Sequence, residues 1–178
     1  NLNFKKLPNI MGVLNLTPDS FSDGGKFNKK NKATKHAIEM LKSGANLIDV
    51  GGESTRPGSQ AINAKLEWSR ISKVLKLICK KIPVSLDTRK SEIMEKGIKL
   101  GVKIINDVSG LSYDQKTIDT LKKYGTAFVI QHSQGSPENM QNKPIYKNEL
   151  LDINDLFDPQ IKNIRNYVIQ HNMSLIHI

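Results

Sequence analysis

The chain has 178 residues, enough for one domain with a sizeable core, and its 38% apolar and 25% charged residues are ordinary for a globular protein. No apolar run approaches the roughly 20 residues that cross a bilayer. The net charge of +10 comes mostly from scattered lysines without a nucleic-acid-binding motif, so we interpret it as a solvated surface.

Short apolar runs alternate with amphipathic stretches along the chain. We predict strands at 10–15, 46–50, 83–87, 103–107, 127–132 and 174–178, and helices at 31–43, 64–80, 91–100, 115–124 and 155–171. Gly44, Gly101 and Gly125 each follow a predicted helix, where a left-handed residue commonly ends it. This repetition predicts βα units in series, with each helix folded back over a parallel sheet.

Polar residues mark the ends of the first five predicted strands, and they are Asn15, Asp49, Asp87, Asn106 with Asp107, and His132. An open doubly wound sheet gathers its functional groups at one switch point, whereas a (β/α)8 TIM barrel places them at the end of every strand. We therefore expect an α/β fold of the barrel type. A barrel needs eight units and roughly 250 residues. We expect residues 1–178 to form a single domain with the first five to six units, incomplete at its C-terminus.

Residues 15–25, NLTPDSFSDGG, are too long for a tight turn after the first strand, so we expect a loop over the barrel mouth. Asn15 offers an amide oxygen that suits Mg²⁺. Phe21 could cover an aromatic substrate, and Asp23 could complete a polar site when the loop closes. An ordinary solvent-exposed loop explains these residues equally well.

The second strand continues into a glycine-rich segment, IDVGGESTRPG at 48–58. Paired glycines allow backbone N–H groups to form an anion-binding nest, and Ser54, Thr55 and Arg56 add donors that suit phosphate. Arg56 and Arg89 are two of only four arginines, and both lie in strand-end motifs, where a fixed guanidinium fork matters more than bulk charge. We interpret this segment as a phosphate or diphosphate site rather than a simple turn.

Asp87 in SLDTRK and Asn106 in IINDVSG end the third and fourth strands. A carboxylate and an amide that face one cavity can recognise the edge of a flat heterocycle. The alternative is that they cap the helices that follow, which we favour for Asp107. We interpret His132 as a positioning group rather than a base.

In order and spacing, these four motifs resemble the dihydropteroate synthases of folate biosynthesis, over essentially the whole chain. The resemblance implies a TIM-barrel transferase, a family targeted by sulfonamides. Such an enzyme joins p-aminobenzoate to 6-hydroxymethyl-7,8-dihydropterin pyrophosphate, with Mg²⁺ and release of diphosphate. It also implies a cytoplasmic enzyme of small-molecule substrates, with no nucleic-acid or membrane partner, and a homodimer at full length.

The resemblance also implies roles for residues at or just after strand ends. Asn15 would bind the metal, and Thr55 and Arg56 would contact the pyrophosphate. Asp87 and Asn106 would bind the pterin edge, and Phe21 and Asp23 would lie in the loop over p-aminobenzoate. Among these, Asp23 and Arg56 are expected to be catalytic.

Two departures from the family pattern stand out. Gln131 precedes His132, where the family usually has Met, so the polarity of the pterin pocket is open. The family's later Asp, Lys, Arg and His would lie beyond Ile178, so we expect residues 1–178 alone to bind without catalysis. A pterin-dependent methyltransferase is the main chemical rival, but it would lack the NLTPDSFSDGG and STRPG segments.

Overall fold

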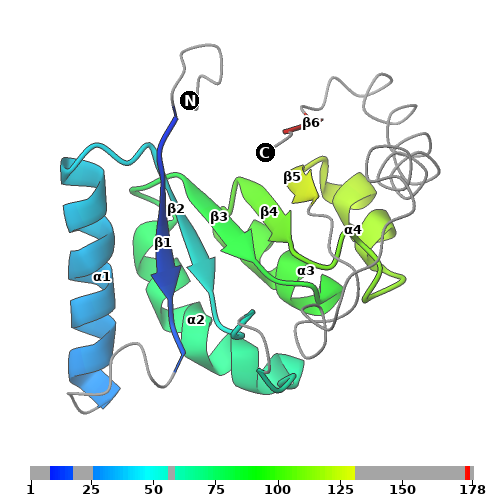
Figure 1. Ribbon diagram of the computed structural model, residues 1–178, viewed down its shortest axis with the longest axis horizontal. Coiled ribbons are helices and arrows are strands. Elements are labelled where there is room, and N and C mark those ends of the chain that lie inside the picture. Colours follow the sequence, from blue (N-terminus) through cyan, green and yellow to red (C-terminus); the bar gives the residue numbers. More distant parts are fainter. Residues whose placement is uncertain (1–8, 18–25, 56–58, 131–174, 177–178) are drawn as a thin grey trace, which may run out of the picture.

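The computed structural model describes residues 9–17, 26–55, 59–130 and 175–176. Strands and helices alternate as far as β5 (Figure 1). The described elements are β1 Met11–Asn15, α1 Lys26–Lys42, β2 Leu47–Gly51, α2 Ala64–Ile78, β3 Val84–Asp87, α3 Ser91–Leu100, β4 Ile104–Asp107, α4 Thr117–Tyr124, β5 Ala127–Ile130 and β6 Leu175–Ile176. Each predicted strand is confirmed to within a few residues. The predicted helix over 155–171 lies outside the described residues.

Helix α1 begins at Lys26, five residues before its predicted start at 31. The sequence KFNKK at 26–30 holds a single apolar residue, too few for a helical periodicity to show. The periodic part is confirmed, because Ala33 and Ala37 are almost fully buried. The lysine-rich first turns therefore hide the start of the helix from a pattern-based prediction.

The strands form one parallel sheet in the order β1-β2-β3-β4-β5-β6. Every strand thus pairs with its neighbour in the chain, and Figure 1 shows the four described helices gathered along one side of the sheet. A doubly wound sheet would reverse its strand order at a switch point, whereas sequential order with helices outside is the arrangement of a TIM barrel. The fold is α/β, as predicted. None of the described helices is both long and apolar enough to span a membrane.

The two faces of the sheet carry different kinds of core. Side chains on the helix-covered face, such as Leu14, Val50 and Leu86, pack with helix residues into the large hydrophobic cluster. Alternate side chains of the same strands point to the other face, where a small cluster contains Leu47, Ile104 and Val129. Apolar burial therefore holds the helices outside the sheet and leaves polar residues to line the inner face near the strand ends.

All three predicted glycine caps adopt the left-handed backbone. Gly44 follows α1 at φ 108°, Gly101 ends α3 at φ 105° and Gly125 ends α4 at φ 59°. An L side chain would be strained there, which explains why glycine follows these helices. Each cap turns the chain directly back into the next strand.

Candidate functional site

The candidate site is a row of residues at the carboxyl end of the sheet. Strand register aligns Asn15 with Gly51, Gly51 with Asp87, and Asp87 with Asn106. Residues aligned in this way project to the same face of a parallel sheet, which here is the inner face. The tertiary structure therefore brings together three of the predicted site residues, from three different strands.

Gly51 leaves room for the two polar side chains beside it. A Cβ atom built on Gly51 would lie 3.4 Å from Asn15 Oδ1 and 3.2 Å from Asp87 Oδ2. A side chain at this position would press on the Asp87 oxygen and lie in contact with the Asn15 oxygen. The glycine thus keeps an amide oxygen from β1 and a carboxyl oxygen from β3 close to the same point, an oxygen-rich corner of the inner face.

Asp49 joins this site although it was predicted only as a strand end. Strand β2 continues to Gly51, so Asp49 lies one row deeper on the inner face, opposite Ser85. Asn106 Nδ2 donates a hydrogen bond of 3.1 Å to Asp49 Oδ2. Ser85 lies opposite Asp49, and a hydrogen bond from its hydroxyl partly offsets the effect of burial on the pKa of the Asp49 carboxyl. The two buried side chains therefore partner one another on the inner face.

Electrostatics around Asp87 favour its neutral form. Burial, followed by repulsion from Asp49, Glu67 and other nearby carboxylates, raises the pKa of Asp87 from 3.8 to about 8. Burial also raises the pKa of Asp49. A ligand that presents N–H donors to this corner would favour the ionised carboxylate, and binding would then be coupled to proton release.

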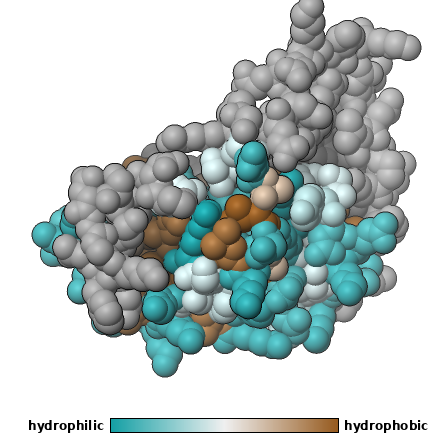
Figure 2. Space-filling view, turned by 90° about the horizontal axis from the view of Figure 1, so that it is seen from below, coloured by the Kyte–Doolittle hydropathy of each residue, from teal (hydrophilic) through white to brown (hydrophobic). Residues whose placement is uncertain are grey.

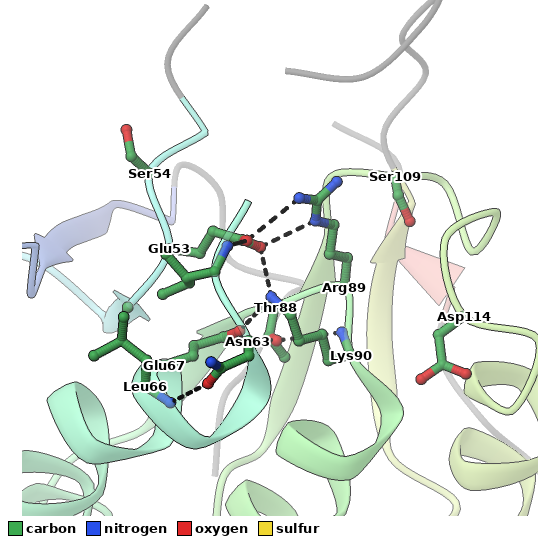
Figure 3. A network of polar contacts seen from close by, with 12 residues as sticks. Glu53, Ser54, Asn63, Leu66, Glu67, Thr88, Arg89, Lys90, Ser109 and Asp114 are labelled. Atoms are coloured by element: carbon green, nitrogen blue, oxygen red, sulfur yellow. Dashed lines mark hydrogen bonds and ion pairs between the residues drawn. The ribbon is translucent and has the colours of Figure 1, made fainter. Parts of the chain in front are cut away.

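A buried ion cluster stands beside the row, formed by Glu53, Glu67, Arg89 and Lys90 (Figure 3). Lys90 Nζ lies 2.8 Å from Glu53 Oε2 and 2.7 Å from Glu67 Oε2. Arg89 Nε lies 3.0 Å from Glu53 Oε2, and the guanidinium stacks over the Tyr113 ring at 4.1 Å. The fork of Arg89 therefore engages a carboxylate of the protein itself.

This cluster was missed in the sequence, although one signal was present. Glu67 stands four residues before Ile71 on α2, in line with the buried Val74 and Ile78. A charged residue on an apolar helical stripe indicates a buried partner. No comparable signal indicated that the partner would be Lys90.

Asp107 does not cap a helix, contrary to the prediction. Its Oδ1 accepts hydrogen bonds from Ser109 N at 2.8 Å and Ser109 Oγ at 2.6 Å. Helix α4 begins only at Thr117, so the carboxylate stabilises the turn directly after β4. Its role is structural, as expected, but it supports a turn.

Of the remaining predicted site residues, the structure describes Thr55 and leaves the others outside its described ranges. Thr55 is described and partly buried, two residues after Glu53. Phe21, Asp23, Arg56, Gln131 and His132 lie outside the described residues, so their roles stay predictions.

Figure 2 looks onto the end of the molecule to which the strands of Figure 1 point, where an apolar patch lies between hydrophilic residues. No group of three His, Cys, Asp or Glu side chains among the described residues is arranged to hold a metal ion.

Comparison with known proteins gives one consistent result. The model of the pterin binding enzyme family matches residues 11–176. Dihydropteroate synthase of Escherichia coli K12 is 41% identical over 156 residues, which cover 86% of this chain and 55% of that protein. The enzyme of Neisseria meningitidis serogroup C is 45% identical over 144 residues, 79% of this chain and 50% of that protein.

Solved structures agree with these matches. A Yersinia pestis dihydropteroate synthase in complex with a sulfonamide drug has a TM-score of 0.82 at 37% identity, covering 93% of this chain and 60% of that one. A Clostridium difficile dihydropteroate synthase in the presence of pteroic acid has a TM-score of 0.84 at 36% identity, covering 98% and 63%. The chain spans about half the length of the curated relatives it matches.

Proposed function

Since the chain belongs to the pterin-binding enzyme family, we propose that the protein is a dihydropteroate synthase of folate biosynthesis. In this reaction the amine nitrogen of p-aminobenzoate forms a bond to the methylene carbon of 6-hydroxymethyl-7,8-dihydropterin pyrophosphate. The carbon–oxygen bond to the diphosphate breaks, diphosphate leaves, and the amine gives up one proton. The products are 7,8-dihydropteroate and diphosphate.

The row of Asn15, Asp87 and Asn106 around Gly51 is the observation that carries this proposal. A pterin ring is flat and offers both donors and acceptors along one edge. Asp87 and Asn106 supply a carboxyl group and an amide side by side, which suits that edge. Asp49 and Ser85 lie one row deeper on the same face, where the buried end of the ring would lie.

We assign the diphosphate to the segment after β2. Thr55 offers a hydroxyl donor there, and Arg56 adds a guanidinium that would stabilise the negative charge on the leaving diphosphate. Phe21 and Asp23 are proposed to close over p-aminobenzoate and hold its amine near the methylene carbon. The protein therefore needs little acid–base chemistry, and its main work is to orient two substrates.

Asn15 is the residue that would hold Mg²⁺. Magnesium prefers oxygen ligands and often takes only one or two from the protein, with water and substrate phosphates completing its shell. The Asn15 Oδ1 atom at the end of β1, beside Gly51, fits this pattern. When bound, Mg²⁺ would neutralise charge on the diphosphate.

The wider setting is proposed on the same basis. The substrates are small molecules, and the basic surface could help to attract the anionic pterin pyrophosphate. A homodimer in the cytoplasm is the expected state, and the single cysteine, Cys79, suits a reducing compartment.

A direct assay tests the proposal. The full-length protein is incubated with pterin pyrophosphate, p-aminobenzoate and Mg²⁺, and 7,8-dihydropteroate and diphosphate are measured together. We expect the two products in equal amounts. Pterin binding without release of diphosphate would instead indicate a non-catalytic pterin-binding protein, and would contradict the proposed synthase.

A further inference from the structure

The buried carboxylate of Glu53 connects the segment after β2 to neighbouring parts of the chain. Glu53 is only 7% exposed, and its oxygens accept hydrogen bonds from Arg89 Nε at 3.0 Å, Arg89 Nη2 at 3.3 Å, Lys90 Nζ at 2.8 Å and the Ile62 backbone N–H at 2.9 Å. Arg89 and Lys90 come from the connection between β3 and α3, and Ile62 lies just before α2. Glu53 lies at the start of the segment between β2 and α2. It therefore connects that start to Ile62 at the end of the same segment, and to the connection between β3 and α3.

The backbone on either side of Glu53 is fixed as well. Arg70 Nη1 on α2 donates to the Gly52 carbonyl at 2.8 Å, and Ser59 Oγ donates to the Ser54 carbonyl at 2.6 Å. Figure 3 shows the Glu53 carboxylate pointing toward Arg89 while the Ser54 side chain points away from it. The backbone of residues 52–54 is thus held by hydrogen bonds from Arg70 and Ser59 as well as by the contacts of Glu53.

Charge in the cluster is balanced. Glu53 and Glu67 face Arg89 and Lys90, and all four side chains are at most 9% exposed. A buried charge without a partner is strongly destabilising, so removing either carboxylate leaves the cluster with one cation in excess. With both carboxylates present, the two cations are satisfied inside the protein and do not act as free anion ligands.

The two carboxylates differ in where they are attached. Glu67 belongs to helix α2, whose first turn is fixed separately by Asn63, which accepts a hydrogen bond from Leu66 N at 2.8 Å. Glu53 belongs to the segment that continues directly into Ser54 and Thr55. Loss of Glu67 would therefore disturb the charge balance and the hydrogen bond that Thr88 Oγ1 donates to it at 2.5 Å. Loss of Glu53 would disturb the charge balance and also release the backbone that leads to Thr55.

We propose that Glu53 is a positioning residue for diphosphate recognition, which fixes the backbone of residues 52–55 through Arg89, Lys90 and the Ile62 amide. The inference rests on the proposed function, because it takes Thr55 to be a diphosphate ligand. Glu53 itself touches no substrate. Its contribution is to hold donors in place before the ligand arrives, so that less ordering is needed on binding.

The test compares Glu53→Gln with Glu67→Gln in the full-length protein. Both changes keep side-chain size and remove one negative charge beside Lys90. They therefore match in charge, and differ in whether the residue belongs to the segment after β2 or to helix α2. Calorimetry measures the Kd of inorganic diphosphate and of pteroate, which carries no diphosphate. Steady-state assays give KM for both substrates, and hydrogen exchange follows the Ser54 and Thr55 amides.

For Glu53→Gln we expect the Kd of diphosphate and the KM of pterin pyrophosphate to rise about ten-fold. The Kd of pteroate and the KM of p-aminobenzoate should change less than about two-fold, and amide exchange at residues 54 and 55 should accelerate. Glu67→Gln should lower Tm by about as much as Glu53→Gln does, but without these effects on binding and amide exchange. Glu53→Asp, which keeps the charge, should restore part of the diphosphate affinity.

Equal effects of the two Gln variants on diphosphate binding would overturn the inference, as would equal loss of diphosphate and pteroate affinity in Glu53→Gln. If neither Gln variant folds, Glu53→Asp decides, since unchanged diphosphate affinity and amide exchange in that variant would also overturn it. Absence of dihydropteroate formation by the unaltered protein would refute the proposed function. The exchange measurement would still decide whether Glu53 fixes residues 52–55.

Discussion

Asn106 Nδ2 donates a hydrogen bond to Asp49 Oδ2 at 3.1 Å, and so connects β4 to β2 across the strand that separates them. Both side chains lie on the inner face and are almost fully buried, at 4% exposure each. The bond directs the amino group of the Asn106 amide toward Asp49. The Asn106 side chain is therefore held in place by a deeper carboxylate on another strand.

Gly51→Ala should damage the site with little effect on stability. The added Cβ would meet Asp87 Oδ2 at 3.2 Å, so the Asp87 side chain must shift by a few tenths of an ångström, and it would lie in contact with Asn15 Oδ1 at 3.4 Å. Small misplacements of binding groups are costly in catalysis, and we expect kcat/KM to fall about ten-fold or more. Gly12→Ala on the helix-covered face is the control, since it presses on Met40 and should lower Tm while kcat/KM is unchanged. An unaltered kcat/KM in Gly51→Ala would show that the row does not bind substrate.

Asp87→Asn should stabilise the ligand-free protein at high pH. The folded pKa is raised to about 8 by burial and by neighbouring carboxylates, so the stability linked to its proton is fully present below the ordinary pKa of 3.8. That stability is lost as the pH rises toward and through 8, because the unfolded chain gives up the proton first. Since Asn imitates the neutral form, the Tm of the variant relative to the unaltered protein should grow from near zero at pH 4 to about 4 °C or more at pH 8.

Asp114→Asn is a control for which the change in Tm should have the opposite sign. Burial opposes ionisation of Asp114, but hydrogen bonds from Ser91 and Lys116 outweigh it and lower the pKa of Asp114. A group with a lowered folded pKa stabilises the protein above its unfolded pKa, so Asp114→Asn should lower Tm at neutral pH. A Tm difference for Asp87→Asn that is constant from pH 4 to pH 8 would contradict the assigned pKa.

Asn15→Ala should weaken the response to magnesium. If Asn15 Oδ1 is a ligand, the Mg²⁺ concentration for half-maximal activity should rise about ten-fold, because one of few protein oxygens is lost. Binding of pteroate without metal should be unaffected. Asn46→Ala is a matched control, because Asn46 Oδ1 accepts from the Ile10 N–H at the opposite end of the sheet. An equal magnesium response in both variants would remove Asn15 from the metal site.

Arg56→Ala should reduce catalysis much more than pterin binding. The guanidinium is proposed to stabilise charge on the leaving diphosphate, so its loss should lower kcat about 100-fold or more. The Kd of pteroate should stay within about three-fold, since pteroate lacks the diphosphate. Lys73→Ala removes one positive charge from the exposed face of α2 and controls for net charge. Losses of equal size in kcat and in pteroate affinity would refute the assignment.

Leu86 and Gly97 should show strongly coupled effects on stability. Leu86 is fully buried in β3, and a Cβ on Gly97 of α3 would overlap with its Cδ2 atom. Leu86→Ala should cost about 2–5 kcal/mol and Gly97→Ala about 1–3 kcal/mol of unfolding free energy. The double variant should lose less than the sum, because the added methyl group fills part of the cavity. Denaturant unfolding measures all three, and additive losses would mean that the helix and strand do not pack as described.

Local patterns in the sequence were sufficient for the order of strands and helices. Short apolar runs, helical stripes such as Ile71 to Ile78, and glycines at 101 and 125 depend on nearest-neighbour backbone preferences and on burial of one face. The same local logic placed Asn15, Asp87 and Asn106 at strand ends, and parallel pairing then aligned them in one row. The fold class and the three row residues were therefore predictable.

Contacts between distant segments were decided only by the tertiary structure. Glu53 and Lys90 are 37 residues apart, and Asn106 and Asp49 are 57 apart. Nothing in either local sequence identifies these partners, because each pairing depends on strand register and on the burial of both side chains in the folded chain. The sequence by itself determined which polar residues end the strands. Burial in the folded sheet decided which of them hold one another in place.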